Sequence, residues 1–334
     1  MPRITLCMIV RDEEAMLPAC LESVAGVVDE MVIVDTGSED GTVAIAKAAG
    51  AKVVHFPWCD DFAAARNAAL PDATGEWILV LDADERLAPG CGRLLRAVAD
   101  NARFDCGVLP LLNAIHLEAT AEGILNGTER SGEPILLPRF VRNAPDLQWS
   151  GRVHESVDDW LKSNGCRVTR IDCPILHYGA VADLRLELGK AERNLALLER
   201  RCAEEPDRPG PFVYLSHELG RAGQPKRAYE AAVRAWTNLC AALRPFEEPN
   251  GRVRVDGLPS IEGPCSLLAA LLLGRGAAGE ALGVLDQAER WGARHPNFLM
   301  LRGTAFESMV VRASGEERRE LLRRAAAAYR AALS

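Results

Sequence analysis

Two carboxylates one residue apart, in Asp82-Ala83-Asp84, are the side chains of this sequence best suited to hold a cation. They follow an apolar run, and without a positive charge nearby they would repel each other. Hard divalent ions such as Mg²⁺ take oxygen ligands and bridge a few protein carboxylates to substrate phosphates. The triplet therefore predicts a divalent-cation site that faces a diphosphate, although acidic residues in such a place also cap helices.

Short apolar runs that alternate with amphipathic segments precede these and other polar residues. The runs are 4–10, 30–34, 52–56 and 77–81. Continuous apolar strands are expected where helices cover both faces of a sheet, which predicts a mostly parallel, doubly wound α/β sheet. Ligands of such sheets bind beyond the carboxyl ends of the strands. Polar, acidic segments stand at those ends, at 11–14, 35–42 and 82–85.

A change of pattern late in the sequence predicts two domains. Two further apolar runs, 107–112 and 135–141, extend the sheet. A last β-like run, 167–176, ends in His177-Tyr178-Gly179, and helical patterns begin near Leu184. We therefore expect an α/β domain over 1–182 and an all-α domain over 183–334.

The helical part contains segments that resemble tetratricopeptide repeats. A helix over 225–238 carries small residues, a second version runs from 267 to 291, and a degenerate third spans 297–332. Small residues let paired helices of such repeats pack closely. The Pro- and Gly-rich segment 245–264 interrupts the spacing. The sequence predicts an all-α, tetratricopeptide-like second domain.

Composition excludes several classes of function. A net charge of -8 lacks the surplus of Lys and Arg that binding to nucleic acid needs. The longest apolar run, 267–273, is much shorter than the ~20 residues of a membrane-spanning helix. The 10 cysteines form no C-x-x-C pair, and the N-terminus shows no export signal. We expect no transmembrane segment, reduced cysteines and a cytoplasmic location.

Four blocks in order along the chain resemble the motifs of family 2 glycosyltransferases: 7–14, 34–42, 62–67 and 81–85. The resemblance is closest to the bacterial branch in which tetratricopeptide-like helices follow the catalytic domain, a branch that includes the bacteriocin S-glycosyltransferases. It extends over essentially the whole chain. The implied fold of the first domain is of the GT-A type, and the implied donor is a nucleotide sugar.

The resemblance also implies which residues contact the nucleotide. Asp35 would accept a hydrogen bond from the base, Glu13 would lie near the nucleoside, and Arg66 would approach the nucleotide or its phosphates. The full implied set is Val10, Glu13, Asp35, Ser38, Arg66, Asp82 and Ala83. The alternative for 35–42 is a turn with Ser38 or Asp40 as helix N-cap. The alternative for Arg66 is a solvated helix face.

A metal site follows from the same resemblance. Asp84 would ligate the ion directly, Asp82 would face the ribose or a metal-bound water, and His177 occupies the position of a third ligand. A lone His after a strand is more often structural. Because imidazole suits Mn²⁺ better than Mg²⁺, His177 would favour manganese, and the expected cofactor is Mn²⁺ or Mg²⁺.

The block 149–155, Trp-Ser-Gly-Arg-Val-His-Glu, is similar to the catalytic loop of this branch, where many relatives have an acidic pair. An inverting transfer needs a carboxylate that takes the acceptor proton. Glu155 is the expected base. His154 is the competitor, because its reference pKa of about 6.5 suits a base at neutral pH. Asp158 or Asp159 is the base if Glu155 and His154 only brace the loop.

The sequence thus predicts an inverting, metal-assisted glycosyltransferase that uses a UDP-type sugar and an unidentified acceptor, whether peptide, saccharide or small molecule. A sugar nucleotidyltransferase is the first alternative, but it normally has a Gly-rich loop after the first strand, and 11–14 contain no glycine. The second alternative is an inactive, repeat-containing binding protein, against which the intact acidic blocks argue. The helical domain could bind a peptide acceptor or form a homodimer.

Overall fold

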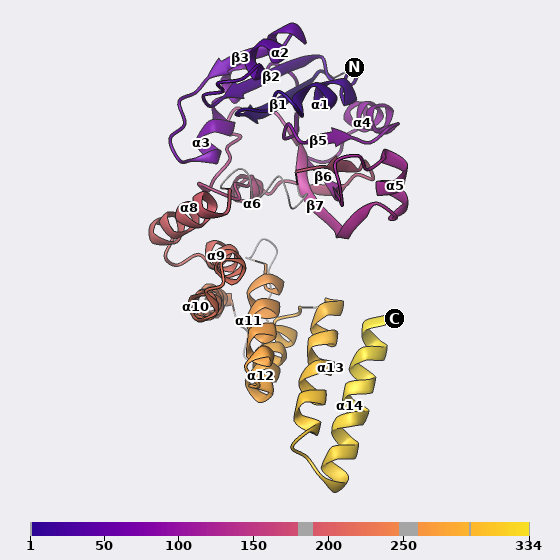
Figure 1. Ribbon diagram of the computed structural model, residues 1–334, viewed down its shortest axis with the longest axis vertical. Helices are drawn as coiled ribbons and strands as arrows, with labels where there is room; N and C mark the ends of the chain where they lie inside the picture. The colour runs from indigo at the N-terminus through magenta and orange to yellow at the C-terminus, as the bar shows by residue number, and fades with distance from the viewer. Residues whose placement is uncertain (1, 180–189, 247–259, 294, 334) are drawn as a thin grey trace. The chain divides into compact units, whose positions relative to one another are not determined.

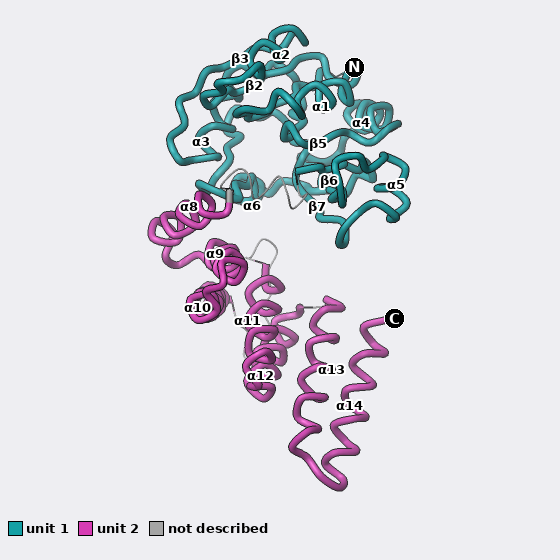
Figure 2. Tube along the Cα trace, viewed as in Figure 1, with its two compact units in different colours: residues 1–190 teal, residues 191–334 magenta. Residues whose placement is uncertain are grey.

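The computed structural model of the chain describes residues 2–179, 190–246, 260–293 and 295–333. The chain divides into two compact units, Met1–Lys190 and Ala191–Ser334 (Figure 2). The predicted boundary at 182/183 lies outside the described residues. The α/β-then-helical order that the sequence predicts is confirmed (Figure 1).

The first unit is built on a sheet whose first half is parallel, as predicted. Its strands are β1 (Ile4–Val10), β2 (Glu30–Asp35), β3 (Lys52–His55) and β4 (Trp77–Val80), in the order β3-β2-β1-β4. Each neighbouring pair runs in parallel, so the carboxyl ends of all of them lie at one edge. The acidic segments that follow β1, β2 and β4 therefore meet at that edge.

Beyond β4 the sheet becomes mixed. The remaining strands are β5 (Glu85–Leu87), β6 (Cys106–Ala114), β7 (Arg130–Arg142), β8 (Val168–Arg170) and β9 (Ile175–His177). β7 is antiparallel to both β4 and β6, whereas β6 and β9 are parallel and β5 is antiparallel to β9. This arrangement places β5, the strand after the acidic triplet, beside β9 at the end of the sheet.

Helices cover both faces of the sheet, which explains its continuous apolar strands. The described helices of this unit are α1 (Leu17–Ser23), α2 (Thr42–Ala48), α3 (Phe62–Asn67), α4 (Cys91–Asp100), α5 (Ala121–Asn126) and α6 (Asp158–Ser163). Successive residues of β1 enter different cores: Leu6 and Met8 pack with α1 and α4, and Cys7 packs with α3 and α6. The doubly wound prediction is confirmed.

The second unit is helical throughout the part that the structure describes. It contains α8 (Lys190–Glu204), α9 (Pro209–Arg221), α10 (Pro225–Leu243), α11 (Glu262–Gly274), α12 (Ala278–Arg290), α13 (Pro296–Val310) and α14 (Gly315–Leu333). Small buried residues let neighbours approach: Ser216 Oγ of α9 donates to Ala228 O of α10, and Gly303 of α13 lies against Tyr329 of α14. The predicted helical pairs are confirmed.

Among the described residues, no helix is both long and apolar enough to cross a bilayer.

Candidate active site

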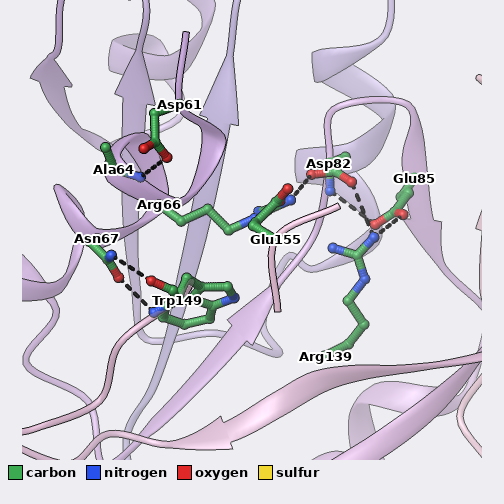
Figure 3. Close-up of polar contacts among 9 residues, drawn as sticks. All are labelled: Asp61, Ala64, Arg66, Asn67, Asp82, Glu85, Arg139, Trp149 and Glu155. Carbon is green, nitrogen blue, oxygen red and sulfur yellow. Dashed lines mark hydrogen bonds and ion pairs between the residues drawn. The ribbon is translucent and has the colours of Figure 1, made fainter. Parts of the chain in front are cut away.

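Arg66 joins two acidic residues that are far from it in sequence. Its Nε lies 2.5 Å from Glu155 Oε1, and its Nη2 lies 2.8 Å from Asp82 Oδ1 (Figure 3). Only about 10% of the Arg66 side chain is exposed. The alternative of a solvated helix face for Arg66 is therefore wrong, and the structure brings three sequence-predicted residues into one network.

The helix that carries Arg66 is fixed at its start and at its end. Asp61 is the N-cap of α3, and its Oδ1 accepts a hydrogen bond from Ala64 N at 2.9 Å. At the other end, the Asn67 side chain accepts from Trp149 N and donates to Trp149 O (Figure 3). The loop 149–155 is thus bound directly to the helix that presents Arg66.

The loop 149–155 is closed at its base by paired backbone bonds between Ser150 and Ser156. His154 adopts a φ of 52°, a left-handed conformation that is uncommon for a residue with a Cβ. His154 is exposed, whereas the Glu155 side chain is 11% exposed and turned to Arg66. Asp159 accepts a hydrogen bond from Ser150 Oγ at 2.8 Å, so it braces the loop.

Arg139 and Glu85 belong to the same network, and the sequence reasoning missed both. Arg139 Nη2 lies 3.1 Å from Asp82 Oδ2 and 2.5 Å from Glu85 Oε1, while Glu85 Oε2 accepts from Asp82 N at 2.9 Å (Figure 3). Both residues are buried. A charged residue within the apolar run 135–141 was the signal that could have identified Arg139, because buried charges are almost always paired.

The charges of this network shift the pKa values of its acids in opposite directions. Burial alone would raise the pKa of Asp82, but the charges and hydrogen bonds of Arg66 and Arg139 hold it well below its usual range. Burial raises the pKa of Glu85 to about 7, and Asp82 adds to the rise while Arg139 opposes it. Asp82 is therefore ionised at neutral pH, whereas Glu85 titrates close to neutral pH.

Asp84 and His177 form a second cluster, held by the pairing of β5 with β9. The Asp84 carbonyl accepts from Tyr178 N at 2.9 Å, and His177 Nε2 lies 3.7 Å from Asp84 Oδ2. His177 Nδ1 lies 2.7 Å from Asn113 Oδ1, which orients the ring. Burial lowers the pKa of His177, but the hydrogen bond and charge of Asp84 outweigh it and raise that pKa above its ordinary value.

The two side chains of this second cluster are of the kinds that hold a divalent ion in proteins. A carboxylate and an imidazole suit Mn²⁺. Gly179 lets the Asp84 carboxylate lie directly against the backbone, since a Cβ there would collide with that carboxylate and come 3.0 Å from His177 Nε2. Across both clusters, four carboxylates face two guanidinium groups and the His177 imidazole.

Asp82, the other predicted ligand, is placed differently. Both of its carboxylate oxygens face arginines, Oδ1 toward Arg66 and Oδ2 toward Arg139. Among the described residues, no three His, Cys, Asp or Glu side chains gather as a metal-binding group. The structure therefore brings Asp84 and His177 together and keeps Asp82 in the arginine network. Metal binding by all of these residues stays a prediction.

Three of the predicted nucleotide residues, Glu13, Asp35 and Ser38, lie in or beside two loops that are hydrogen-bonded to each other. Asp35 Oδ1 accepts from Ser38 N at 3.0 Å, and Asp35 Oδ2 lies 3.2 Å from His55 Nδ1. Ser38 Oγ accepts from Asp12 N at 3.0 Å, and Glu13 N donates to Thr42 Oγ1 at 2.7 Å. Each loop thus fixes the conformation of the other.

The turn that was the alternative explanation for 35–42 is present in part. Gly41 is the N-cap of α2 and has no side-chain cap bond, so neither Ser38 nor Asp40 is the cap residue. Asp40 Oδ1 nevertheless accepts from Thr42 N at 2.9 Å. Asp35 is buried, and so are Val10 and Ala83. Contacts of these residues with a nucleotide stay predictions.

A wide cleft lies on another side of this unit. It is lined by α1, α4, the loop before α5, and the side chains of Arg86, Leu176 and Tyr178. Arg86 and Tyr178 are the sequence neighbours of Glu85 and His177, but the lining of the cleft contains none of the network residues.

Comparisons with known proteins match part of the N-terminal unit to a described family. Residues 5–112 match the family described as Glycosyl transferase family 2. A TPR repeat-containing protein of Synechococcus elongatus is 41% identical over 228 residues, which is 66% of this chain and 52% of that protein. The SPbeta prophage-derived glycosyltransferase SunS of Bacillus subtilis is 27% identical over 223 residues, 65% of this chain and 49% of SunS.

Among solved structures, that of S. aureus TarS 1-349 in complex with UDP covers 98% of this chain and 88% of its own, with 14% identity and a TM-score of 0.43. The chain spans about half the length of the curated relatives named above. The matched segment 5–112 holds β1 to β4, the acidic triplet and Arg66. The N-terminal unit of this chain therefore carries a domain of glycosyltransferase family 2.

Proposed function

We propose that the chain is an inverting, metal-assisted glycosyltransferase that moves a sugar from a UDP-type nucleotide sugar to an acceptor. The observation that carries this proposal is the ion-paired chain Glu155–Arg66–Asp82, which stands at the carboxyl ends of parallel strands beside the Asp84–His177 cluster. Such a transfer requires a base that takes a proton, a cation for the phosphates and a metal-binding pair.

On the donor side, the two bonded loops after β1 and β2 would hold the nucleoside, and Arg66 would face the diphosphate. Asp84 and His177 would hold a divalent ion, which supplies neutralisation of the charge that grows on the departing diphosphate. The buried Asp35 keeps the second loop in place through Ser38 and His55. Stabilisation of the leaving group is expected to be the larger contribution to the rate.

On the acceptor side, Glu155 would act as the base. The acceptor nucleophile attacks the anomeric carbon from the face opposite the diphosphate and forms the new bond to that carbon. Its proton passes to a Glu155 carboxylate oxygen. The bond between the anomeric carbon and the diphosphate oxygen breaks, and its electron pair leaves with UDP. One displacement inverts the configuration of the sugar.

The experiment that tests the activity compares the wild type with Asp84→Ala. The wild type is incubated with a panel of UDP-sugars and Mn²⁺, and separately with nucleoside triphosphates and sugar phosphates, while UDP and pyrophosphate are measured. UDP release by the wild type and its loss in the folded variant support the proposal. Pyrophosphate release instead would identify a nucleotidyltransferase. Asp146→Ala, which removes an exposed carboxylate, is the matched control.

Binding gives a second readout that does not need the acceptor. A ligand at 100 times its dissociation constant stabilises the folded state by about 2.7 kcal/mol, so UDP with Mn²⁺ is expected to raise the melting temperature. The helical unit is proposed to bind the acceptor, whether peptide or saccharide, or to form a homodimer. Sedimentation of the full chain tests the dimer, and a peptide and saccharide array tests the acceptor.

A further inference from the structure

Arg139 is a buried cation that serves two carboxylates through a single nitrogen. Its Nη2 contacts Asp82 Oδ2 at 3.1 Å and Glu85 Oε1 at 2.5 Å. The Arg139 Nε atom is also buried, and it has no hydrogen-bond partner among the described residues. Arg139 therefore binds both carboxylates through Nη2 and not through two nitrogens of its guanidinium group.

Glu85 completes a closed arrangement around Asp82. Glu85 Oε2 accepts from Asp82 N at 2.9 Å, and Glu85 N donates to Asp82 O at 3.0 Å. Arg139 links the other Glu85 oxygen to the Asp82 side chain. Glu85 of β5 and Arg139 of β7 thus hold both the backbone and the carboxylate of Asp82.

We propose that Arg139 is a positioning residue, which fixes the Asp82 carboxylate so that Asp82 in turn aligns Arg66 with Glu155 and with the donor. This inference rests on the proposed function for its donor. Asp82 Oδ1 lies 2.8 Å from Arg66 Nη2, so the direction of the carboxylate determines where that guanidinium lies. Without Arg139, Asp82 keeps only one cation, and its carboxylate is free to rotate away from Arg66.

The contacts of Arg139 explain why it acts through Asp82 and not on the donor itself, since its Nη2 also bonds the buried Glu85 and its Nε is buried. The Arg139 side chain is 10% exposed, whereas the Asp82 side chain is 38% exposed. Asp82 therefore lies at the surface of the site, with Arg139 behind it. A residue in that position changes reactivity by moving its neighbour, and small displacements of reacting groups reduce rates strongly.

The two arginines differ in a way that a Lys substitution reveals. Arg66 bonds Glu155 through Nε and Asp82 through Nη2, so it needs the fixed fork that only Arg supplies. Arg139 makes both of its bonds from one nitrogen, which a Lys ammonium reproduces. A Lys at position 139 is therefore expected to keep the bonds to Asp82 and Glu85, whereas a Lys at position 66 is not expected to keep the bonds to Glu155 and Asp82.

The test measures binding of UDP with Mn²⁺ by calorimetry, together with the ¹⁵N resonance of the Arg66 Nε–H group. Because Arg139→Met alone leaves Glu85 buried without a counter-charge and endangers folding, the main variant is the double substitution Arg139→Met with Glu85→Gln. Arg142→Met is the matched control, since Arg142 also lies on β7 but pairs with Asp105 and stacks on Trp77.

The double variant is expected to bind UDP about tenfold more weakly or worse, with a shifted Arg66 resonance. Arg139→Lys is expected to bind UDP within about threefold of the wild-type affinity and to leave the Arg66 resonance at its wild-type position. Arg66→Lys is expected to lose UDP affinity. The control leaves both readouts unchanged. A folded double variant with wild-type affinity and an unmoved Arg66 resonance overturns the positioning role.

The two proposals fail in different ways. If the wild type binds no UDP, the proposed donor is wrong, but the Arg66 resonance still decides whether Arg139 positions that residue. If the wild type binds UDP and Arg139→Lys behaves like the double variant, the single-nitrogen role of Arg139 is wrong while the proposed function stands.

Discussion

Arg66 and Glu155 lie 89 residues apart in sequence, yet Arg66 Nε is 2.5 Å from Glu155 Oε1. The contact exists because the loop that ends in Glu155 is hydrogen-bonded to α3. The backbone of Trp149, in this loop, bonds the side chain of Asn67, which directly follows Arg66 on α3. The same guanidinium also bonds Asp82. The residue expected to face the donor diphosphate therefore also determines where the expected base lies.

Glu155→Gln is predicted to reduce turnover by about 100-fold or more while the chain still binds UDP, because the amide cannot accept the acceptor proton. UDP release measures the rate, and calorimetry measures binding. Asp159→Asn is the comparison, since Asp159 braces Ser150. If Glu155→Gln keeps wild-type turnover and His154→Ala loses it, the base is His154 and not Glu155.

Gly179→Ala is predicted to lower affinity for Mn²⁺ by about tenfold or more, because overpacking typically costs 1–3 kcal/mol. The added Cβ would meet the Asp84 carboxylate and approach His177 Nε2. Titration of Mn²⁺ followed by electron paramagnetic resonance measures the affinity. Gly283→Ala in α12, where a Cβ meets nothing within 4 Å, is the control. Unchanged Mn²⁺ binding in Gly179→Ala would place the metal elsewhere.

Asn113→Ala is predicted to weaken Mn²⁺ binding by about tenfold, as loss of the partner that orients a metal-binding His usually does. Asn113 Oδ1 lies 2.7 Å from His177 Nδ1, and the hydrogen bond that Nδ1–H donates to this oxygen leaves Nε2 to face Asp84. The tautomer of His177 is measured from its ¹⁵N shifts. An identical tautomer and affinity in the variant would show that Asn113 is not needed.

Acid is predicted to remove a stabilising contact outside the site. The hydrogen bond of Arg96, helped by Ile4 N and opposed by burial, lowers the pKa of Asp29. A lowered pKa stabilises the fold above the unfolded value of about 3.9, and this contribution is lost as pH falls below it. The difference in unfolding free energy between wild type and Asp29→Asn should therefore be constant near neutral pH and shrink in acid. Urea titrations at several pH values measure it.

Local pattern determined much of this protein. Continuous apolar runs specified the parallel strands, because strands covered on both faces need apolar residues throughout. Acidic residues after those runs identified the edge of the sheet where Asp82, Asp84 and Arg66 lie. Small residues at regular spacing specified the helical pairs of the second unit. These features depend on neighbours in sequence, so the sequence alone could predict them.

The partners of those residues depended on tertiary structure. Arg139 and Asn113 come from β7 and β6, and only the antiparallel pairing of β7 with β4 and the pairing of β6 with β9 bring them to Asp82 and His177. The local sequence around a single polar residue inside a strand does not predict which residue will be its partner. The orientation of Asp82 toward two arginines is decided in the same way, since ion pairs between residues distant in sequence form only when the domain has assembled.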